Sequence, residues 1–361
     1  MEESPFKYQG PLDPADVRGR DELLDDLIGR VTARRVTALV GPRRYGKTSL
    51  LRRLAVELTE MSTVWVDLYE VTSMADLVFR VDKALAAADT PFTADAAPFA
   101  ASLQLRLGVA RVEFSRPAKD RPDPVARLGL LLDVLVTTAT RVPTLLILDE
   151  FSSIATVGGA AGALRTALQH HYTDLGIVFA GSMPSVMRQL FTNRVEPFYA
   201  QADLMTIGPL SDAAVTDMVV DGFAATGRGA GLLPGRLTEF AAGHPQRTMQ
   251  LADAAWRHTP EGGSVDASTW ALAVEEVRRV SADPMERLFS HFQRAERDVL
   301  RIVASGGAIF GNAAILLDVS HGAAAHARDR LLADGDLIES QEGLTVTDPV
   351  LADWIRTTLP L

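Results

Sequence analysis

The chain has 361 residues, of which 47% are hydrophobic and 23% charged, so it can bury two or three domain cores and is not globally disordered. A formal net charge of −10 argues against a protein that coats nucleic acid non-specifically, because such proteins need excess cations. The lack of cysteine excludes disulfides, thiolate zinc sites and cysteine nucleophiles. No signal-peptide pattern and no run of about twenty apolar residues is present, so we expect a cytoplasmic protein.

Strands and helices alternate along the first 209 residues. Apolar, β-branched runs predict the strands, and leucines at helical spacing predict the helices. Alternation of this kind predicts an α/β fold, a parallel sheet with helices on both faces. The expected strands are 36–40, 63–68, 144–148, 176–180 and 204–207, and the expected helices are 47–58, 73–87, 124–140 and 160–175.

A proline-rich stretch, residues 88–124, interrupts this alternation. Within it, apolar residues alternate on both sides of Gly108, which predicts a small hairpin at 100–116. Two interpretations stay open: a structural insertion on the edge of the domain, or an edge strand on which a partner docks.

The chain becomes helical after Pro209, which marks a change of domain. Helices are expected from Ser211 to Val280. From about Asp283, three helices followed by two short strands and a last helix are typical of a winged helix. We therefore predict an α/β domain at 1–209, a helical lid at 210–282 and a winged-helix domain at 283–361.

A glycine-framed loop follows the first strand and matches the phosphate-loop pattern G-x-x-x-x-G-K-[ST]. Glycine tolerates the dihedrals that turn backbone N–H groups toward a polyphosphate, and the helix start adds its positive dipole end. The Lys47 ammonium suits the β- and γ-phosphate oxygens, and the Thr48 hydroxyl suits Mg²⁺. We predict that ATP or ADP binds through Gly41, Pro42, Arg43, Arg44, Tyr45, Gly46, Lys47, Thr48 and Ser49, in a P-loop NTPase fold.

An acidic pair ends the apolar strand at 144–148. Asp149 is expected to hold magnesium through its water shell, and Glu150 to activate the attacking water as general base. The strand at 176–180 runs into Gly181 and Ser182, where a polar side chain can reach the γ-phosphate or the water. Lys47, Glu150 and Ser182 are therefore the candidate catalytic residues, and Thr48 and Asp149 the candidate metal ligands.

Three segments together resemble the archaeal-type ATPases of the STAND branch of the AAA+-related P-loop NTPases. They are GPRRYGKTSL at 41–50, LLILDEF at 145–151 and FAGSM at 179–183. The resemblance implies an ATP-operated switch whose lid and winged helix close over bound nucleotide. It therefore implies a slow ATPase that couples its nucleotide state to a protein partner.

The resemblance extends along nearly the whole chain. Residues 5–11 and 17–21 are similar to the family's N-terminal element beside the adenine, Gly243-His-Pro245 resembles the GxP element of its lid, and Thr347-Asp-Pro349 resembles the end of its winged helix. It implies that Val17, Gly19 and Arg20 belong to the adenine side and that Pro245 covers the base. Arg247 is either a lid-borne nucleotide sensor or a surface helix residue.

One family element is missing. Where many members carry Tyr-Gly-Arg before the last strand, this chain has Phe198-Tyr-Ala-Gln201. Arg194 is the candidate substitute that would reach a neighbouring subunit's phosphate; the alternative is a solvated loop arginine. An oligomer therefore stays possible.

DNA binding is the alternative function. The predicted third helix of the winged domain offers His321, His326, Arg328 and Arg330 as readers of DNA. From Asp283 onward, however, seven arginines face twelve acidic residues, and a net-negative reader must overcome phosphate repulsion. We therefore favour a lid or protein-interaction role over a DNA-binding regulatory ATPase.

Overall fold

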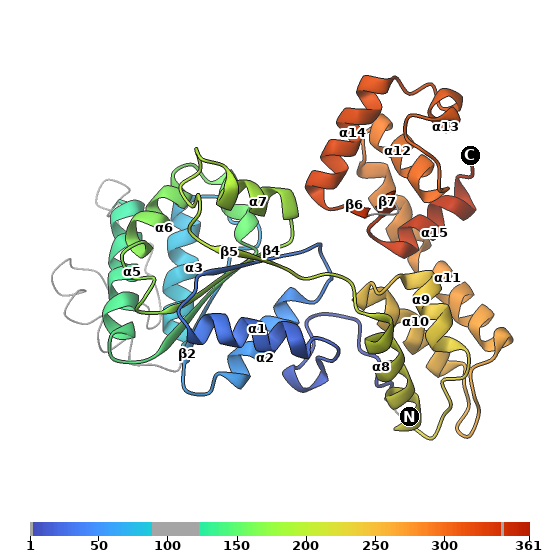
Figure 1. The fold of residues 1–361 in the computed structure, drawn as a ribbon, viewed down its shortest axis with the longest axis horizontal. Helices are drawn as coiled ribbons and strands as arrows, with labels where there is room; N and C mark the ends of the chain where they lie inside the picture. The colour runs from blue at the N-terminus through green and yellow to red at the C-terminus, as the bar shows by residue number, and fades with distance from the viewer. Residues whose placement is uncertain (1–2, 89–122, 341–342) are drawn as a thin grey trace, which may run out of the picture. The chain divides into compact units, whose positions relative to one another are not determined.

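The computed structural model describes residues 3–88, 123–340 and 343–361 (Figure 1). The hairpin predicted at 100–116 lies outside these residues. The chain divides into two compact units. We call residues 22–41 and 50–207 the sheet unit, and residues 1–21, 42–49 and 208–361 the lid unit.

The sheet has five parallel strands in the order β2-β3-β4-β1-β5. Each of the five strands predicted for this sheet is present, with its ends within one residue of the expected positions. The parallel sheet is therefore confirmed. The strands are β1 (Thr37–Val40), β2 (Ser62–Asp67), β3 (Thr144–Asp149), β4 (Gly176–Gly181) and β5 (Asp203–Thr206).

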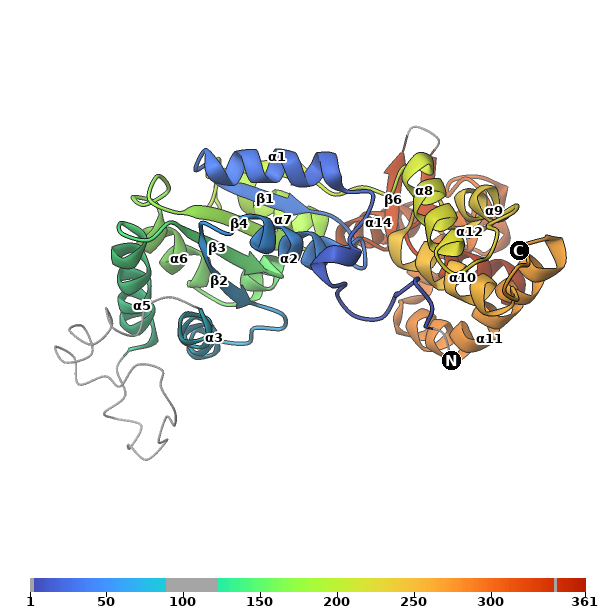
Figure 2. The same cartoon turned by 90° about the horizontal axis from the view of Figure 1, so that it is seen from below.

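Helices cover both faces of this sheet. Phe179 of β4 packs in one hydrophobic cluster with α3 (Met74–Ala87), α5 (Pro124–Ala139) and α6 (Ala160–Leu168). On the opposite face, Gly176 lies so close to Val31 of α1 (Asp21–Thr32) that a Cβ there would be 2.8 Å from its side chain. Figure 2 shows α1 and α3 on opposite sides of the strands. Burial on both faces explains the continuous apolar runs of the central strands.

The helix expected at 160–175 is shorter than predicted. It ends at Leu168, and turns that include a bond from His171 Nδ1 to Asp174 Oδ2 at 2.8 Å connect it to β4. The chain needs this turn because β4 must start again in the parallel direction. Among the described residues, helices α1 and α7 (Pro184–Thr192) were not predicted, and neither were the short 3₁₀ helices η1 (Pro14–Asp16) and η3 (Phe151–Thr156).

Four phenylalanines form the core behind the carboxyl ends of β3 and β4. Phe151, Phe179, Phe191 and Phe198 are buried, and each ring lies 4.5–5.9 Å from the other three, centroid to centroid. Tilted and edge-on ring pairs add stabilisation to the burial of their area. Because Phe151 directly follows Glu150, this cluster anchors the backbone of the acidic pair.

The lid unit has one continuous hydrophobic core. It joins the helices after Pro209 to the N-terminal segment, whose Phe6 packs on Phe223 at a centroid distance of 5.4 Å. The elements of this unit are α8 (Asp212–Ala224), α9 (Leu233–Ala241), α10 (Pro245–Arg257), α11 (Ala267–His291), α12 (Arg294–Ala304), α13 (Asn312–Leu316), α14 (His321–Asp334), β6 (Leu337–Ser340), β7 (Gly343–Val346) and α15 (Pro349–Thr358).

The last part of the lid unit has the element order expected from the sequence. Three helices precede β6 and β7, which pair antiparallel, and α15 follows (Figure 1). We call residues 294–361 the C-terminal module. The expected boundary at 282–283 falls inside α11, which continues through Pro284 to His291. In the described residues, no helix is long and apolar enough to cross a membrane.

The phenylalanine core leads to the first prediction. Phe198→Ala should lower the free energy of unfolding by about 3–5 kcal/mol, because it removes a fully buried ring and leaves a cavity. Urea denaturation would measure the loss. Phe79→Ala, at an exposed position of α3, is the control and should change stability by less than about 0.5 kcal/mol. Equal losses in both variants would contradict the assignment of this core.

Candidate functional site

The carboxyl ends of three strands carry the predicted chemistry at one edge of the sheet. β4 lies between β1 and β3, and the register pairs Val40 with Gly181 and Leu148 with Phe179. Gly41, the first residue of the phosphate loop, donates its N–H to the Gly181 carbonyl at 3.5 Å. The residues that follow β4 therefore lie between the start of the loop and the acidic pair after β3.

The acidic pair and Ser182 form one hydrogen-bonded group. Ser182 Oγ donates to Glu150 Oε2 at 2.6 Å, and the Glu150 N–H donates to Asp149 Oδ1 at 3.0 Å. Glu150 has a left-handed backbone with φ 52°, which is uncommon for a residue with a side chain. Asp149 and Ser182 are buried. The structure thus brings together two predicted catalytic residues, Glu150 and Ser182, beside the predicted metal ligand Asp149.

The phosphate loop has the local geometry that its sequence predicts. Gly46 has a φ of +87°, which glycine adopts without strain, and α2 (Lys47–Glu57) begins directly after it. The buried Lys47 Nζ donates to the Pro42 carbonyl at 2.8 Å, so the ammonium bonds across its own loop. Thr48 is the second residue of α2.

The donor set suits Mg²⁺ only in part. A hydroxyl at Thr48 and a carboxylate at Asp149 are the hard oxygen ligands that this ion prefers. In the described part of the chain, no group of three or more histidine, aspartate or glutamate side chains is placed to hold a metal. A magnesium ion here would therefore take its other ligands from phosphate and water.

Two predicted nucleotide contacts of the loop are engaged within the lid unit. Ser49 Oγ accepts a hydrogen bond from the Leu12 N–H at 3.0 Å. Tyr45 is buried, which raises its pKa to about 12, and its ring packs edge-on against His244 at 5.0 Å between centroids. These contacts join the loop to the N-terminal segment and to the start of α10.

The predicted adenine-side residues lie close to the strand-to-lid connection. Arg20 donates to the Gly208 carbonyl at 2.7 Å and to the Pro209 carbonyl at 3.3 Å, and burial lowers its pKa to about 10. Gly19 has a φ of +67°, and a Cβ there would lie 2.7 Å from the Ala214 Cβ. Val17 is buried. The segment is thus packed against the start of the lid.

The start of α10 carries the remaining predicted lid residues. Pro245 is its first residue, and His244 caps it by accepting from the Arg247 N–H at 3.4 Å. Burial lowers the pKa of His244 to about 4, so the imidazole is neutral at pH 7. Gln246 Nε2 donates to the Tyr8 carbonyl at 3.1 Å. Helix α10 is therefore tied directly to the N-terminal segment.

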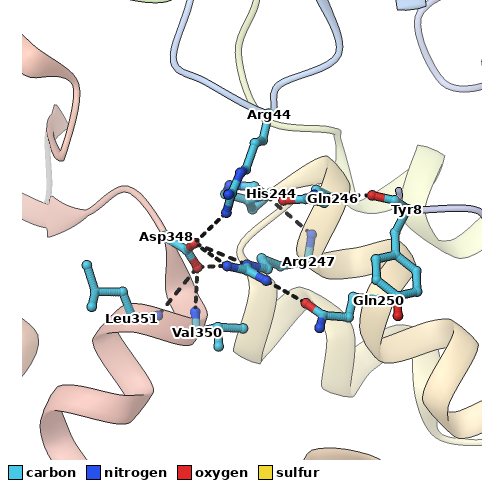
Figure 3. A network of polar contacts seen from close by, with 9 residues as sticks. All are labelled: Tyr8, Arg44, His244, Gln246, Arg247, Gln250, Asp348, Val350 and Leu351. Atoms are coloured by element: carbon cyan, nitrogen blue, oxygen red, sulfur yellow. Dashed lines mark hydrogen bonds and ion pairs between the residues drawn. The ribbon is translucent and has the colours of Figure 1, made fainter. Parts of the chain in front are cut away.

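Arg247 is a buried residue, which rules out the surface-helix alternative. Its guanidinium forms a bidentate pair with Asp348, which directly precedes α15 (Figure 3). Sequence reasoning did not assign a role to Asp348. The Thr-Asp-Pro signal indicates a helix start, but no local pattern identifies a partner 101 positions away in the chain.

Comparison with known proteins supports an AAA-type domain. Residues 30–190 match the family model described as AAA domain. Among curated proteins, none matches this chain. The sequence match therefore covers strands β1 to β4, the phosphate loop and the acidic pair, but not β5.

Solved structures share the whole fold at low sequence identity. The Walker-type ATPase PABY2304 of Pyrococcus abyssi is 16% identical, with a TM-score of 0.71 over 98% of this chain and 99% of that one. The ORC2 protein of Aeropyrum pernix in ADPNP–ADP complexes is 14% identical, with a TM-score of 0.54 over 99% and 98%. The ORC1 protein of the same organism, in complex with DNA, is 12% identical, with a TM-score of 0.52 over 95% and 93%. These similarities show a P-loop ATPase fold.

Asp336, which interacts electrostatically with Arg43 of the phosphate loop, leads to a pH-dependent prediction. Burial, followed by the charge of Asp334, raises its pKa from 3.8 to about 6; Glu296 and Asp348 act in the same direction, and Arg43 opposes them. The folded state binds this proton more tightly than the unfolded chain does. Loss of the proton, which is largely complete above pH 6, therefore lowers the free energy of unfolding. Asp336→Asn should therefore stabilise the protein at pH 7.5 by on the order of 1 kcal/mol, and the gain should vanish toward pH 4.

Thermal or urea unfolding at pH 4, 6 and 7.5 would measure this difference. Asp334→Asn is the control for the removal of a neighbouring charge, because Asp334 is more exposed. A gain from Asp336→Asn that is equal at all three pH values would contradict the raised pKa.

Proposed function

We propose that this chain binds ATP with Mg²⁺, hydrolyses it slowly and uses the nucleotide state to control a protein partner. The observation that carries the proposal is the Ser182–Glu150–Asp149 group at the edge of the sheet where the phosphate loop begins. An ordered carboxylate beside a buried aspartate is what water activation next to a metal requires. The AAA-domain match and the P-loop fold support it.

Each residue has a proposed role in hydrolysis. The loop amides and Lys47 would hold the β- and γ-phosphates. Thr48, and Asp149 through the water shell, would hold Mg²⁺, whose charge would offset that of the phosphates. A water oxygen forms a bond to the γ-phosphorus as the bond to the β–γ bridging oxygen breaks, and Glu150 accepts the water's proton. Ser182 orients the Glu150 carboxylate through its 2.6 Å hydrogen bond.

Binding of phosphate requires one local exchange. In this structure the Lys47 ammonium is bonded to the Pro42 carbonyl. A phosphate oxygen is a stronger partner because the bond joins two charged groups. Lys47 would therefore leave the carbonyl for the nucleotide, and the loop would open toward its ligand.

The domain roles extend the same proposal. Residues 1–209 are the ATPase domain, 210–282 the lid and 283–361 a winged-helix module, as in the STAND-type ATPases that the sequence resembles. Val17, Gly19, Arg20 and Pro245 would enclose the adenine. Arg194 is exposed, which suits a finger toward a neighbouring subunit only if the protein oligomerises.

Separable effects of three substitutions test the ATPase proposal. Lys47→Ala should abolish ATP binding, Asp149→Asn should weaken only Mg²⁺-dependent binding, and Glu150→Gln should keep binding while slowing hydrolysis by about 10²–10⁴-fold. Calorimetry and phosphate release would measure the two steps. Glu60→Gln, at an exposed turn, is the charge-matched control. Full hydrolysis by Glu150→Gln would remove Glu150 from the role of base.

A protein partner fits the C-terminal module better than DNA does. Ile315 and Leu316 of α13 expose 76% and 78% of their surface, an apolar area more typical of protein contact. The two arginines of α14 are engaged with acids: Arg328 with Asp329 at 2.6 Å, and Arg330 with the buried Glu296 at 3.3 Å. Reading DNA would require these pairs to break.

The DNA-binding alternative rests on the fold shared with ORC1, whose structure is a complex with DNA. A pull-down with the Glu150→Gln protein, once with ATP and once with ADP, would separate the two functions. The bound material is then assayed for protein and for nucleic acid. We expect a protein enriched in the ATP sample and no nucleic acid. Salt-sensitive, ATP-dependent retention of DNA that Arg330→Ala abolishes would instead establish the alternative.

A further inference from the structure

The Asp348 carboxylate lies at the centre of a polar network in the lid unit (Figure 3). Arg247 donates to it from Nε at 2.9 and 3.1 Å and from Nη2 at 2.5 Å. The backbone N–H groups of Val350 and Leu351 donate to Oδ1 at 2.9 and 3.4 Å, so the carboxylate also caps α15. Arg247 of α10 and the first turn of α15 thus fix the position of this carboxylate.

The phosphate loop reaches the same carboxylate. Arg44 Nη1 lies 3.7 Å from Asp348 Oδ2, and Figure 3 shows the Arg44 side chain pointing from its loop toward Asp348. Arg44 occupies one of the variable positions of the G-x-x-x-x-G-K pattern and has a left-handed φ of +66°. Loop, lid helix and C-terminal module therefore meet at one anion.

Two guanidinium groups share this anion. Arg44 and Arg247 both face the Asp348 carboxylate, while His244 beside them is neutral at pH 7 and Gln250 only accepts from Arg247 Nη1 at 2.6 Å. Burial alone would raise the pKa of Asp348, but the hydrogen bonds and charge of Arg247 hold it below its ordinary value. A more highly charged anion would attract the same two guanidinium groups more strongly than one carboxylate does.

We propose that Asp348 is an internal substitute for phosphate, which holds Arg44 and Arg247 when no nucleotide is bound and is displaced when ATP binds. The proposal rests on the proposed function, because it requires ATP on the phosphate loop. It makes the C-terminal module a competitor of the nucleotide, so that ATP releases this module, which is the reverse of the closure over bound nucleotide that the family resemblance implies.

The physical basis is competition for the same cations. Arg247 is buried, and a buried guanidinium left without an anion is strongly unfavourable, so it exchanges Asp348 only for another anion. Triphosphate carries more charge than a carboxylate and pairs with a guanidinium in the same bidentate way. ATP and the Asp348 contact exclude each other at these cations. The free energy that this contact contributes to docking of the module therefore weakens ATP binding by the same amount.

Asp348→Asn is the variant that isolates this charge. Asparagine also caps helices, so the hydrogen bond to the Val350 N–H can remain while the attraction to both arginines is lost. ATP affinity, measured by calorimetry, should rise about tenfold over the unmodified protein. Asp329→Asn is the control: it removes a charge that pairs with Arg328 inside α14, involves neither the loop nor the pairs that join α15 to α10 and α11, and should leave ATP affinity unchanged.

Hydrogen exchange in the unmodified protein tests the same claim without a variant. Saturating ATP should speed exchange of the first amides of α15 that form backbone hydrogen bonds, such as Ala352, which donates to the Asp348 carbonyl. Unchanged or slower exchange, or an ATP affinity of Asp348→Asn equal to or below that of Asp329→Asn, would overturn the competition. If the unmodified protein binds no ATP at all, the proposed function itself fails; binding without these changes removes only the role of Asp348.

Discussion

The parallel pairing of β1 with β4 and of β4 with β3 is the constraint on which the chemistry depends. Parallel strands end at the same edge, and this register aligns Val40 with Gly181 one strand away from the end of β3. A slip of one residue would turn every side chain of β4 to the other face and remove Phe179 from its cluster. Ser182 would then no longer reach Glu150, and the acidic pair would lose its orientation.

Backbone strain near this edge is balanced by packing. Glu150 is held in a left-handed conformation that costs free energy for a residue with a side chain. Phe151, directly after it, is locked by three other rings, and the Ser182 hydroxyl fixes the carboxylate. The hydrophobic core thus stabilises a geometry that the isolated segment would not adopt, which is how an active site is pre-organised.

The phosphate loop is shared between two kinds of contact. Along the chain, the loop connects β1 to α2. Through its side chains, Tyr45 contacts His244 and Arg44 contacts Asp348, both in the lid unit. If the loop rearranges around phosphate, as proposed, these contacts change with it. This sharing gives a physical route from nucleotide to C-terminal module, over side-chain contacts that a substitution can remove one at a time.

The sequence by itself determined the local features of this protein. The phosphate loop, the acidic pair at the end of an apolar strand, all five strands and the order of helices and strands after Arg294 follow from short-range patterns of hydrophobicity, glycine and charge. These features depend on neighbours within a few residues, and the sequence states such neighbours directly. The helices α1 and α7 were missed although their buried residues recur at helical spacing, Leu24, Leu27 and Val31 in α1 and Met187, Leu190 and Phe191 in α7.

Only the tertiary structure decided which distant side chains meet. The order β2-β3-β4-β1-β5 put Ser182 on Glu150, a contact that parallel alternation alone leaves open. Likewise Arg247, either a sensor or a surface residue by sequence, became a buried partner of Asp348, and Arg44 joined the same anion. Such pairs arise from the folding of the whole chain, because electrostatic attraction acts through space and leaves no local trace in the order of residues.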